Sequence, residues 1–180
     1  MPPLTHLPEH FNFAGHLLAV NASRGAKTAY IDDGVTLTYA DLATRVRSVA
    51  GAMLARGLRR EERVLICMHD TVDFPVAFLA ALHTGIVPVP VNTLLIADDF
   101  AYMLGHSRAK AVIVSAALLP MMQRALAAGA NEVATVWVAA ATTALPPGTI
   151  DFAECIAHAP MLMPAATGVD EIAFWLYSSG

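Results

Sequence analysis

The sequence predicts an α/β fold: a doubly wound, largely parallel sheet flanked by helices, with a small hairpin near the N-terminus. Apolar runs rich in β-branched residues recur about every 24 residues, and segments with helical spacing lie between them. Strands separated by helices are typical of βαβ crossovers, whose parallel strands are buried on both faces of the sheet. Nearer the N-terminus, Asp33-Gly34 separates two alternating stretches, as in a tight hairpin.

The first two elements follow from turn and capping residues. Glycine accepts a positive φ without cost, so the stretch "TAYIDDGVTLTY" predicts a hairpin near residues 28–38. The next stretch has apolar residues at helical spacing, with Thr38 and Asp41 spaced as a capping box and Gly57 as the stop. We therefore expect a helix with one apolar face.

The repeating part of the chain begins after this helix. Its predicted strands are residues 63–68, 86–91, 111–115 and 135–139, and its predicted helices are residues 70–84, 98–107 and 118–128. Residues 146–148, Pro-Pro-Gly, then indicate a surface loop, and a short helix is expected near residues 151–158. The apolar run at residues 170–178, "DEIAFWLYS", is expected to be one more buried strand.

The chain is unusually apolar. Apolar residues make up 56% of it and charged residues 14%, against roughly 45–50% and about 25% in ordinary domains. Either the protein associates with a membrane, or protein outside this sequence covers part of its surface. The uncharged stretch at residues 74–92 nears the roughly 20 residues of a membrane helix, but Pro88 and Pro90 interrupt it. Because the N-terminus also lacks a signal-peptide pattern, we expect a soluble, cytoplasmic protein.

Charge, cysteines and histidines argue against further classes of protein. A net charge of −4 leaves no basic footprint for nucleic acid, and the arginines of residues 55–63 are interleaved with glutamates. Cys67 and Cys155 are isolated in apolar stretches, as reduced core cysteines of cytosolic proteins usually are. No metal-ligand spacing, and hence no expected metal site, is found around the seven histidines: His6, His10, His16, His69, His83, His106 and His158.

Two acidic positions have alternative interpretations. His69-Asp70 follows a predicted parallel strand, at the edge of the sheet where doubly wound folds bind ligands. The preferred alternative is that Asp70 caps the following helix. The pair Asp98-Asp99 begins another predicted helix, where the helix dipole stabilises negative charge, so capping is preferred to acid-base catalysis.

Small residues follow the last apolar run: Ser178, Ser179 and Gly180. A loop that binds phosphates needs small residues, because successive backbone N–H groups must converge on the oxygens, and hydroxyls add donors. Three small residues after a strand also form ordinary turns. From the residues alone, a phosphate-binding loop and a turn both stay open.

Taken as whole strings, long stretches of the chain resemble the N-terminal third of the adenylate-forming acyl-CoA ligases. Three stretches are general to this superfamily: "LTYADL", "LAALHTGIVPVPVN" and "LYSSG". Three resemble its benzoate-CoA ligase branch: "FNFAGHLL", "VNTLLIADDFAYMLGHSRA" and "FWLYSSG". The resemblance implies that residues 1–180 are the N-terminal portion of the large AMP-binding domain, ending at the start of the phosphate loop, with the C-terminal domain absent.

In that family, Tyr-Ser-Ser-Gly opens a loop that wraps the β- and γ-phosphates of ATP. The resemblance therefore implies that Ser178, Ser179 and Gly180 are the first residues of this loop. The chain departs from the family pattern by stopping before the lysine and the second glycine of the loop. The resemblance gives no residue of this chain a catalytic role or a metal ion.

The resemblance implies a two-step reaction that uses ATP, Mg²⁺ and coenzyme A, in aromatic compound degradation. A benzoate oxygen attacks the α-phosphate of ATP, which gives benzoyl-adenylate and pyrophosphate; the CoA thiol then attacks the acyl carbon and expels AMP. A carboxylate is a poor electrophile with a poor leaving group, so the enzyme mainly positions reactants and neutralises developing charge. Residues 1–180 alone are expected to be inactive.

The expected partners are benzoate, ATP, CoA and the remainder of the same chain, and neither nucleic acid nor a membrane is expected. Assembly into a homo-oligomer stays open. Two other functions remain as alternatives. One is a ligase for another aryl acid, or an adenylation domain that loads a carrier protein. The other is a non-catalytic α/β binding module.

Overall fold

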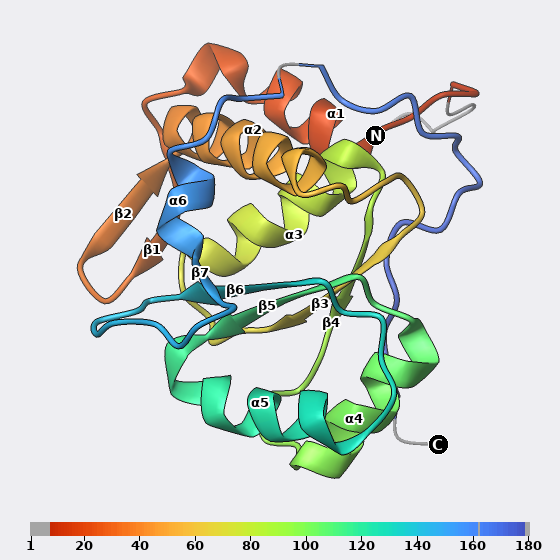
Figure 1. The fold of residues 1–180 in the computed structure, drawn as a ribbon. Coiled ribbons are helices and arrows are strands. Elements are labelled where there is room, and N and C mark those ends of the chain that lie inside the picture. Colours follow the sequence, from red (N-terminus) through yellow and green to blue (C-terminus); the bar gives the residue numbers. More distant parts are fainter. Residues whose placement is uncertain (1–7, 162, 179–180) are drawn as a thin grey trace.

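The chain folds into three layers, helices over a parallel sheet over helices (Figure 1). A computed structural model describes residues 8–161 and 163–178. The five-stranded sheet has the order β4-β3-β5-β6-β7, and every neighbouring pair is parallel. Its strands are β3 (Arg63–Cys67), β4 (Val87–Pro90), β5 (Ala111–Ser115), β6 (Thr135–Ala139) and β7 (Ile150–Asp151). The predicted doubly wound parallel sheet is confirmed.

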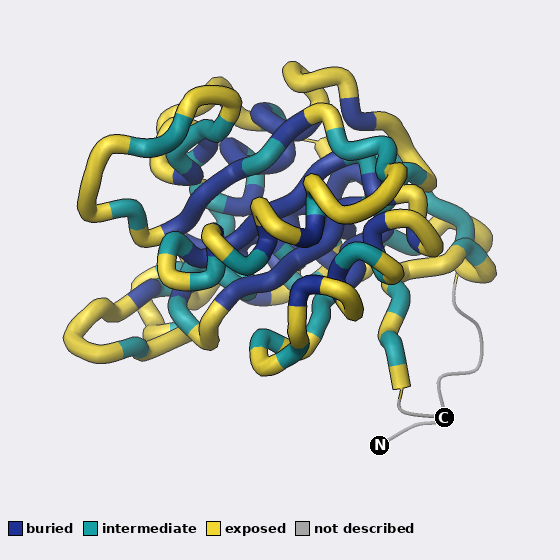
Figure 2. The backbone as a smooth tube through the Cα atoms, turned by 60° about the horizontal axis from the view of Figure 1, so that its bottom comes forward, coloured by how far each residue is buried: buried dark blue, intermediate teal, exposed yellow. Residues whose placement is uncertain are grey.

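Helices cover both faces of this sheet. One face carries α1 (Phe13–Val20), α2 (Tyr39–Ala55), α3 (Asp73–Thr84) and α6 (Phe152–Ile156), and the other carries α4 (Ala97–Ser107) and α5 (Leu119–Ala128). Short 3-10 helices precede the hairpin, η1 (Ala22–Arg24), and α5, η2 (Ala116–Leu118). Figure 2 shows the buried strands through the middle of the molecule. Alternate strand residues enter opposite cores: Val64 and Ile66 lie in one, and Leu65 and Cys67 in the other.

The N-terminal hairpin and its helix have the predicted form. β1 (Thr28–Asp32) pairs antiparallel with β2 (Val35–Thr38), and Gly34 takes a φ of 92° in the turn between them. At the start of α2, the backbone N–H of Asp41 donates to the Thr38 hydroxyl at 3.2 Å, and the N–H of Thr38 donates to the Asp41 carboxylate at 3.2 Å. The capping box is confirmed.

The start of α3 differs from the prediction. The N–H of Thr71 donates to the carbonyl of His69 at 2.8 Å, so the chain turns before the helix and α3 begins at Asp73. Its N-cap is Val72, which makes no side-chain capping bond. The prediction that Asp70 caps this helix is therefore wrong. At α4, Asp99 accepts from the N–H of Ile96 at 3.4 Å, and the predicted capping role is confirmed for that residue.

The expectation of a buried strand at residues 170–178 is wrong. Residues 172–178 are assigned to no strand, and Ile172, Phe174 and Leu176 are 62%, 45% and 68% exposed. The segment crosses the outer edge of the sheet at β4, from the α3 layer to the α4 layer (Figure 1). Its one backbone hydrogen bond to that edge, among the described residues, runs from the N–H of Trp175 to the carbonyl of Pro88 at 3.1 Å.

The prolines of β4 explain why no strand forms there. The N–H groups of Val87 and Val91 donate to the carbonyls of Glu62 and Ile66 on the β3 side. Because backbone groups alternate in direction along a strand, the nitrogens of Pro88 and Pro90 belong to the outer edge, and proline has no N–H. The outer edge of β4 therefore offers hydrogen-bond acceptors without donors at these positions. A further strand could form only about half of the usual hydrogen bonds with this edge.

A segment without regular structure returns from α6 across α2 and the end of α3. The N–H of Met161 donates to the carbonyl of Arg47 at 2.9 Å, and the N–H of Ala165 donates to the carbonyl of His83 at 2.8 Å. His83 is 1% exposed, and its Nε2 donates to the carbonyl of Met161 at 3.1 Å. Across the described residues, no helix is long and apolar enough to cross a membrane.

Candidate functional site

The predicted phosphate-loop residues lie where the structure ends. Ser178 is exposed and is the last residue described, whereas Ser179 and Gly180 lie outside the described residues. The chain reaches Ser178 after crossing the edge of the sheet at β4, and arrives beside the last turn of α4. For the predicted site, the structure therefore describes the contacts that hold the chain just before Ser178.

An aromatic cluster, here called the aromatic anchor, holds this part of the chain; it consists of Tyr102, His106, Trp175 and Tyr177. The hydroxyl of Tyr177 lies 2.9 Å from Nδ1 of His106 and donates to the carbonyl of Met103 at 3.4 Å. The ring of His106 stacks on Tyr102 at a centroid distance of 5.4 Å and lies 5.7 Å from the ring of Tyr177. Burial raises the pKa of the Tyr177 phenol, so it stays protonated near neutral pH.

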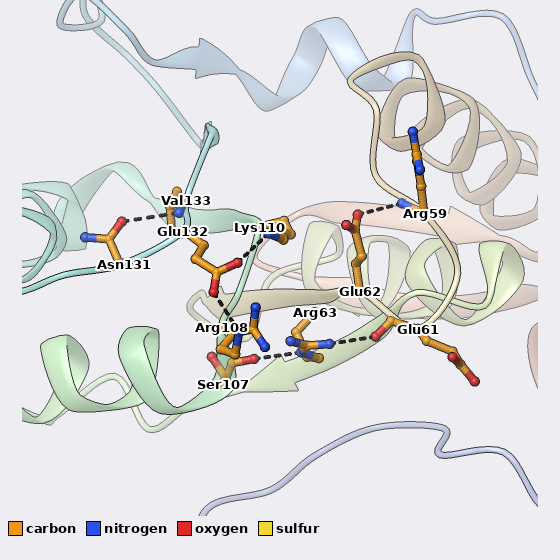
Figure 3. A network of polar contacts seen from close by, with 10 residues as sticks. All are labelled: Arg59, Glu61, Glu62, Arg63, Ser107, Arg108, Lys110, Asn131, Glu132 and Val133. Carbon is orange, nitrogen blue, oxygen red and sulfur yellow. Dashed lines mark hydrogen bonds and ion pairs between the residues drawn. The ribbon is translucent and has the colours of Figure 1, made fainter.

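A cation extends the anchor to the sheet. The guanidinium of Arg63 lies over the ring of Trp175, 5.7 Å from its centroid. The same side chain donates from Nε to the carbonyl of Ser107 at 2.6 Å and from Nη1 to the carbonyl of Glu61 at 3.0 Å (Figure 3). Arg63 therefore joins the start of β3, the end of α4 and the crossing segment. Arg63 is half-buried, and a guanidinium with two carbonyl partners supports an aromatic ring that lies over it.

A small ion network lies next to this support. Glu132 accepts from Nε of Arg108 at 2.6 Å and also pairs with Lys110 (Figure 3). These two hydrogen-bonding cations lower the pKa of Glu132 to about 2. Arg108 ends α4 with a φ of 53°, so the network fixes the turn from α4 into β5. The network lies at the end of the helix that carries His106.

The carboxyl ends of the strands form a second candidate region. The N–H of His69 donates to the hydroxyl of Ser115 at 3.0 Å, which joins the ends of β3 and β5. The following chain leaves β3 toward β4 on one side, whereas β5 lies on the other, so this is the switch point of the sheet, where doubly wound folds bind ligands. A cavity of about 350 Å³ opens beside it, lined in part by His69, Asp70, Asn92 and Thr93.

The sequence indicated His69-Asp70 as a candidate site, whereas Ser115, Asn92 and Thr93 were not predicted. Each of these is a small polar residue at or just after a predicted apolar strand, which is the signal that would have found them. Which of these residues lie close together depends on the order of the strands in the sheet. The sequence of a single strand does not indicate that order.

Apolar cavities lie on the helical side of the crossing segment. One of about 290 Å³ is lined by Phe13, Phe78, Ile172 and Phe174, among others. Its neighbour, of about 440 Å³, shares Phe13 and Phe78 and adds residues such as Ile31, which is 76% exposed. The surplus of apolar residues in the sequence therefore appears as exposed apolar surface here.

The remaining candidates are structural. Cys67 and Cys155 are buried, and burial raises the pKa of their thiols to about 11 and about 12, so both are inert core residues as expected. In residues 8–161 and 163–178, no group of three or more His, Cys, Asp or Glu side chains gathers where it could hold a metal ion.

The chain is similar to known enzymes along nearly its whole length. The family described as AMP-binding enzyme matches residues 18–180. A benzoate--CoA ligase from Thauera aromatica is 39% identical over 183 residues, which cover 99% of this chain and 34% of the relative. A 4-hydroxybenzoate--CoA/benzoate--CoA ligase from Rhodopseudomonas palustris is 41% identical over 163 residues, which cover 89% of this chain and 29% of the relative.

A solved structure is similar in both fold and sequence. The crystal structure of a benzoate CoA ligase from Burkholderia xenovorans LB400 superposes with a TM-score of 0.83 at 47% identity, over 93% of this chain and 32% of that chain. This chain thus spans about a third of the length of the relatives that it matches. On the family match over residues 18–180 and the agreement in fold, the chain belongs to the AMP-binding enzymes.

Proposed function

We propose that residues 1–180 form the N-terminal portion of the AMP-binding domain of a benzoate-CoA ligase. The observation that carries this proposal is the 39% identity to a benzoate--CoA ligase over 99% of this chain. The whole enzyme would activate benzoate with ATP to benzoyl-adenylate, and then transfer the acyl group to CoA with release of AMP. It would act in the cytoplasm, in the degradation of aromatic compounds.

In this proposal Ser178, Ser179 and Gly180 are the first residues of the loop that binds the ATP phosphates. Their backbone N–H groups and the serine hydroxyls are donors suited to phosphate oxygens. The exposure of Ser178 and the anchor on its N-terminal side support the assignment, since a ligand can reach this part of the chain. Magnesium would accompany the phosphates, whose oxygens are ligands that this ion prefers.

Residues of the whole enzyme outside 1–180 would supply the remaining groups that the reaction needs. Since this chain spans 34% of the first relative, most of that relative's length has no counterpart here. The coding sequence after residue 180 should continue through Ser/Thr-Gly into a Pro-Lys-Gly loop, and a reading frame without that loop would contradict the proposal. Residues 1–180 alone should form no benzoyl-CoA.

The test of function is an assay of the whole protein with a panel of acids. Purified protein is given ATP, Mg²⁺, CoA and one acid, and acyl-CoA and AMP are measured together. Benzoate should give both products in equal amounts, and omission of ATP should abolish them. A preference for a fatty acid or an amino acid would reject the proposed substrate class.

Another aryl acid is the second candidate. The relative from Rhodopseudomonas palustris is named for both 4-hydroxybenzoate and benzoate, and it is 41% identical to this chain. The same acid panel separates the two, because a 4-hydroxybenzoate ligase would show a higher kcat/KM for that acid than for benzoate. A carrier-protein-loading domain would instead form the adenylate without transferring the acyl group to CoA.

A further inference from the structure

The last fixed point before the proposed phosphate loop is the side chain of Tyr177. In the described part of the crossing segment, backbone hydrogen bonding ends at Trp175. Leu176 is 68% exposed and Ser178 is also exposed, so neither side chain anchors the chain. Within residues 8–161 and 163–178, Tyr177 is the one of these three whose side chain makes hydrogen bonds, with its hydroxyl 2.9 Å from Nδ1 of His106 and 3.4 Å from the Met103 carbonyl.

The side chain of His106 is exposed but has defined neighbours. It lies in the last turn of α4, its ring stacks on Tyr102, and the carbonyl of the next residue, Ser107, accepts from Arg63 at 2.6 Å. Arg63 also supports the ring of Trp175, which lies 6.4 Å from the ring of His106. The position of Tyr177 is therefore set by a helix end and a strand that are far from it in the sequence.

We propose that His106 is a positioning residue for ATP: through Tyr177 it fixes the backbone that leads into Ser178 and the phosphate loop. The inference rests on the proposed function, since it takes the residues after Tyr177 to bind phosphates. It adds a residue 71 positions from Tyr177 in the sequence, which acts through the hydroxyl of Tyr177.

The physical reason is the sensitivity of phosphate binding to backbone position. Loop N–H groups bind phosphate oxygens only when several of them converge on one point, so a displacement of the loop start weakens all of them together. A single partly exposed hydrogen bond contributes modestly, and its loss should weaken ATP binding by about 3- to 10-fold. Binding of the acid, which does not use this loop, should stay the same.

The experiment uses the whole protein and removes each partner of this hydrogen bond. Tyr177→Phe removes the hydroxyl and keeps the ring, and His106→Phe removes Nδ1 and keeps a ring to stack on Tyr102. The Kd for ATP is measured by calorimetry without the acid, and KM values for ATP and benzoate are measured in the ligase assay. Tyr102→Phe is the control, because it removes a hydroxyl from the same anchor without touching the bond.

Each of the two variants should raise the Kd and KM for ATP by about 3- to 10-fold, with the KM for benzoate within about twofold of wild type. The double variant should be no weaker than the weaker single variant, because both remove the same bond. Tyr102→Phe should bind ATP like wild type.

Three results would overturn the inference: ATP binding unchanged in both variants, ATP and benzoate affected equally, or effects that add fully in the double variant. The proposed function fails separately, if wild-type protein binds ATP but forms no benzoyl-CoA; the Kd values for ATP then still decide the role of His106. Wild-type protein that binds no ATP would reject both.

Discussion

His83 gives the fold a dependence on pH. It is buried at the end of α3, where its Nε2 donates to the carbonyl of Met161, and its Nδ1 has no hydrogen-bond partner among the described residues. Burial lowers the pKa of His83, and the neighbouring Arg47 lowers it further, while the bond to Met161 raises it. The folded protein therefore prefers a neutral imidazole at this position.

The sign of the effect follows from linkage. A histidine whose pKa is lower in the folded state binds protons more readily when unfolded, so stability is undiminished above the unfolded pKa of about 6.5. It falls as the pH drops below that value toward the folded pKa. We expect His83→Gln, which keeps a donor for Met161, to flatten this loss between pH 7.5 and pH 5.5 in thermal melts of the whole protein. An unchanged pH slope would contradict the assignment.

Gly51 shows how closely the returning segment packs on α2. A Cβ at this position would lie 2.1 Å from the carbonyl oxygen of Ala159, which is backbone and cannot rotate away. Gly51→Ala should therefore lower the free energy of unfolding by about 1–3 kcal/mol, as overpacking does. The matched control is Gly129→Ala, where a Cβ meets nothing within 4 Å and φ is −154°. Equal melting temperatures for the two variants would refute the close packing.

At the scale of elements, the capping box of α2 is open to a direct test. Thr38→Ala removes the hydroxyl that accepts from Asp41 and should cost about 1 kcal/mol in urea unfolding. Thr44, in the same helix, only bonds back to the carbonyl of Ala40 at 3.0 Å, so Thr44→Ala should be neutral or slightly stabilising. If both variants unfold at the same urea concentration, the cap contributes nothing measurable.

Elements whose cause is local were predictable from the sequence. The turn at Asp33-Gly34 and the cap at Thr38 are formed by neighbouring residues in the sequence. The apolar runs of the strands can be recognised whichever strands they pair with. β7 was missed because two residues, Ile150 and Asp151, are too few to show a period. The run at residues 170–178 was misassigned because an apolar pattern indicates a need for burial and not the partner that supplies it.

The candidate site likewise combines local features, which the sequence indicates, with a long-range contact, which it does not. The small residues at 178–180 alone left a phosphate loop and an ordinary turn open, and the resemblance to a family favoured the loop. No feature of residues 176–180 alone indicates His106 as a support for Ser178. The hydrogen bond between His106 and Tyr177 spans 71 positions. Such contacts arise when distant elements meet, and they become visible only once the helix, the sheet edge and the crossing segment have their places.

At the scale of the whole molecule, apolar surface is the feature to test. Phe13, Ile31, Ile172, Phe174 and Leu176 are each 45% exposed or more. Neighbouring apolar exposure of this kind favours association, so residues 1–180 expressed alone should aggregate or bind a hydrophobic dye such as ANS. In the whole protein these residues should be covered and dye binding low. A dye-free monomer of residues 1–180 with a cooperative melt would instead favour the binding-module alternative.

The two prolines of β4 also limit how such copies could associate. Continuous growth of a sheet from molecule to molecule needs an edge with alternating donors and acceptors, and Pro88 and Pro90 remove the donors from this one. Copies of the isolated chain should therefore not extend the five-stranded sheet through β4, so fibrils built at this edge, with thioflavin binding and the roughly 4.7 Å cross-β spacing, are not expected. A sequence that leaves so much apolar surface open thus has, at the edge strand β4, two prolines that oppose growth of the sheet into amyloid.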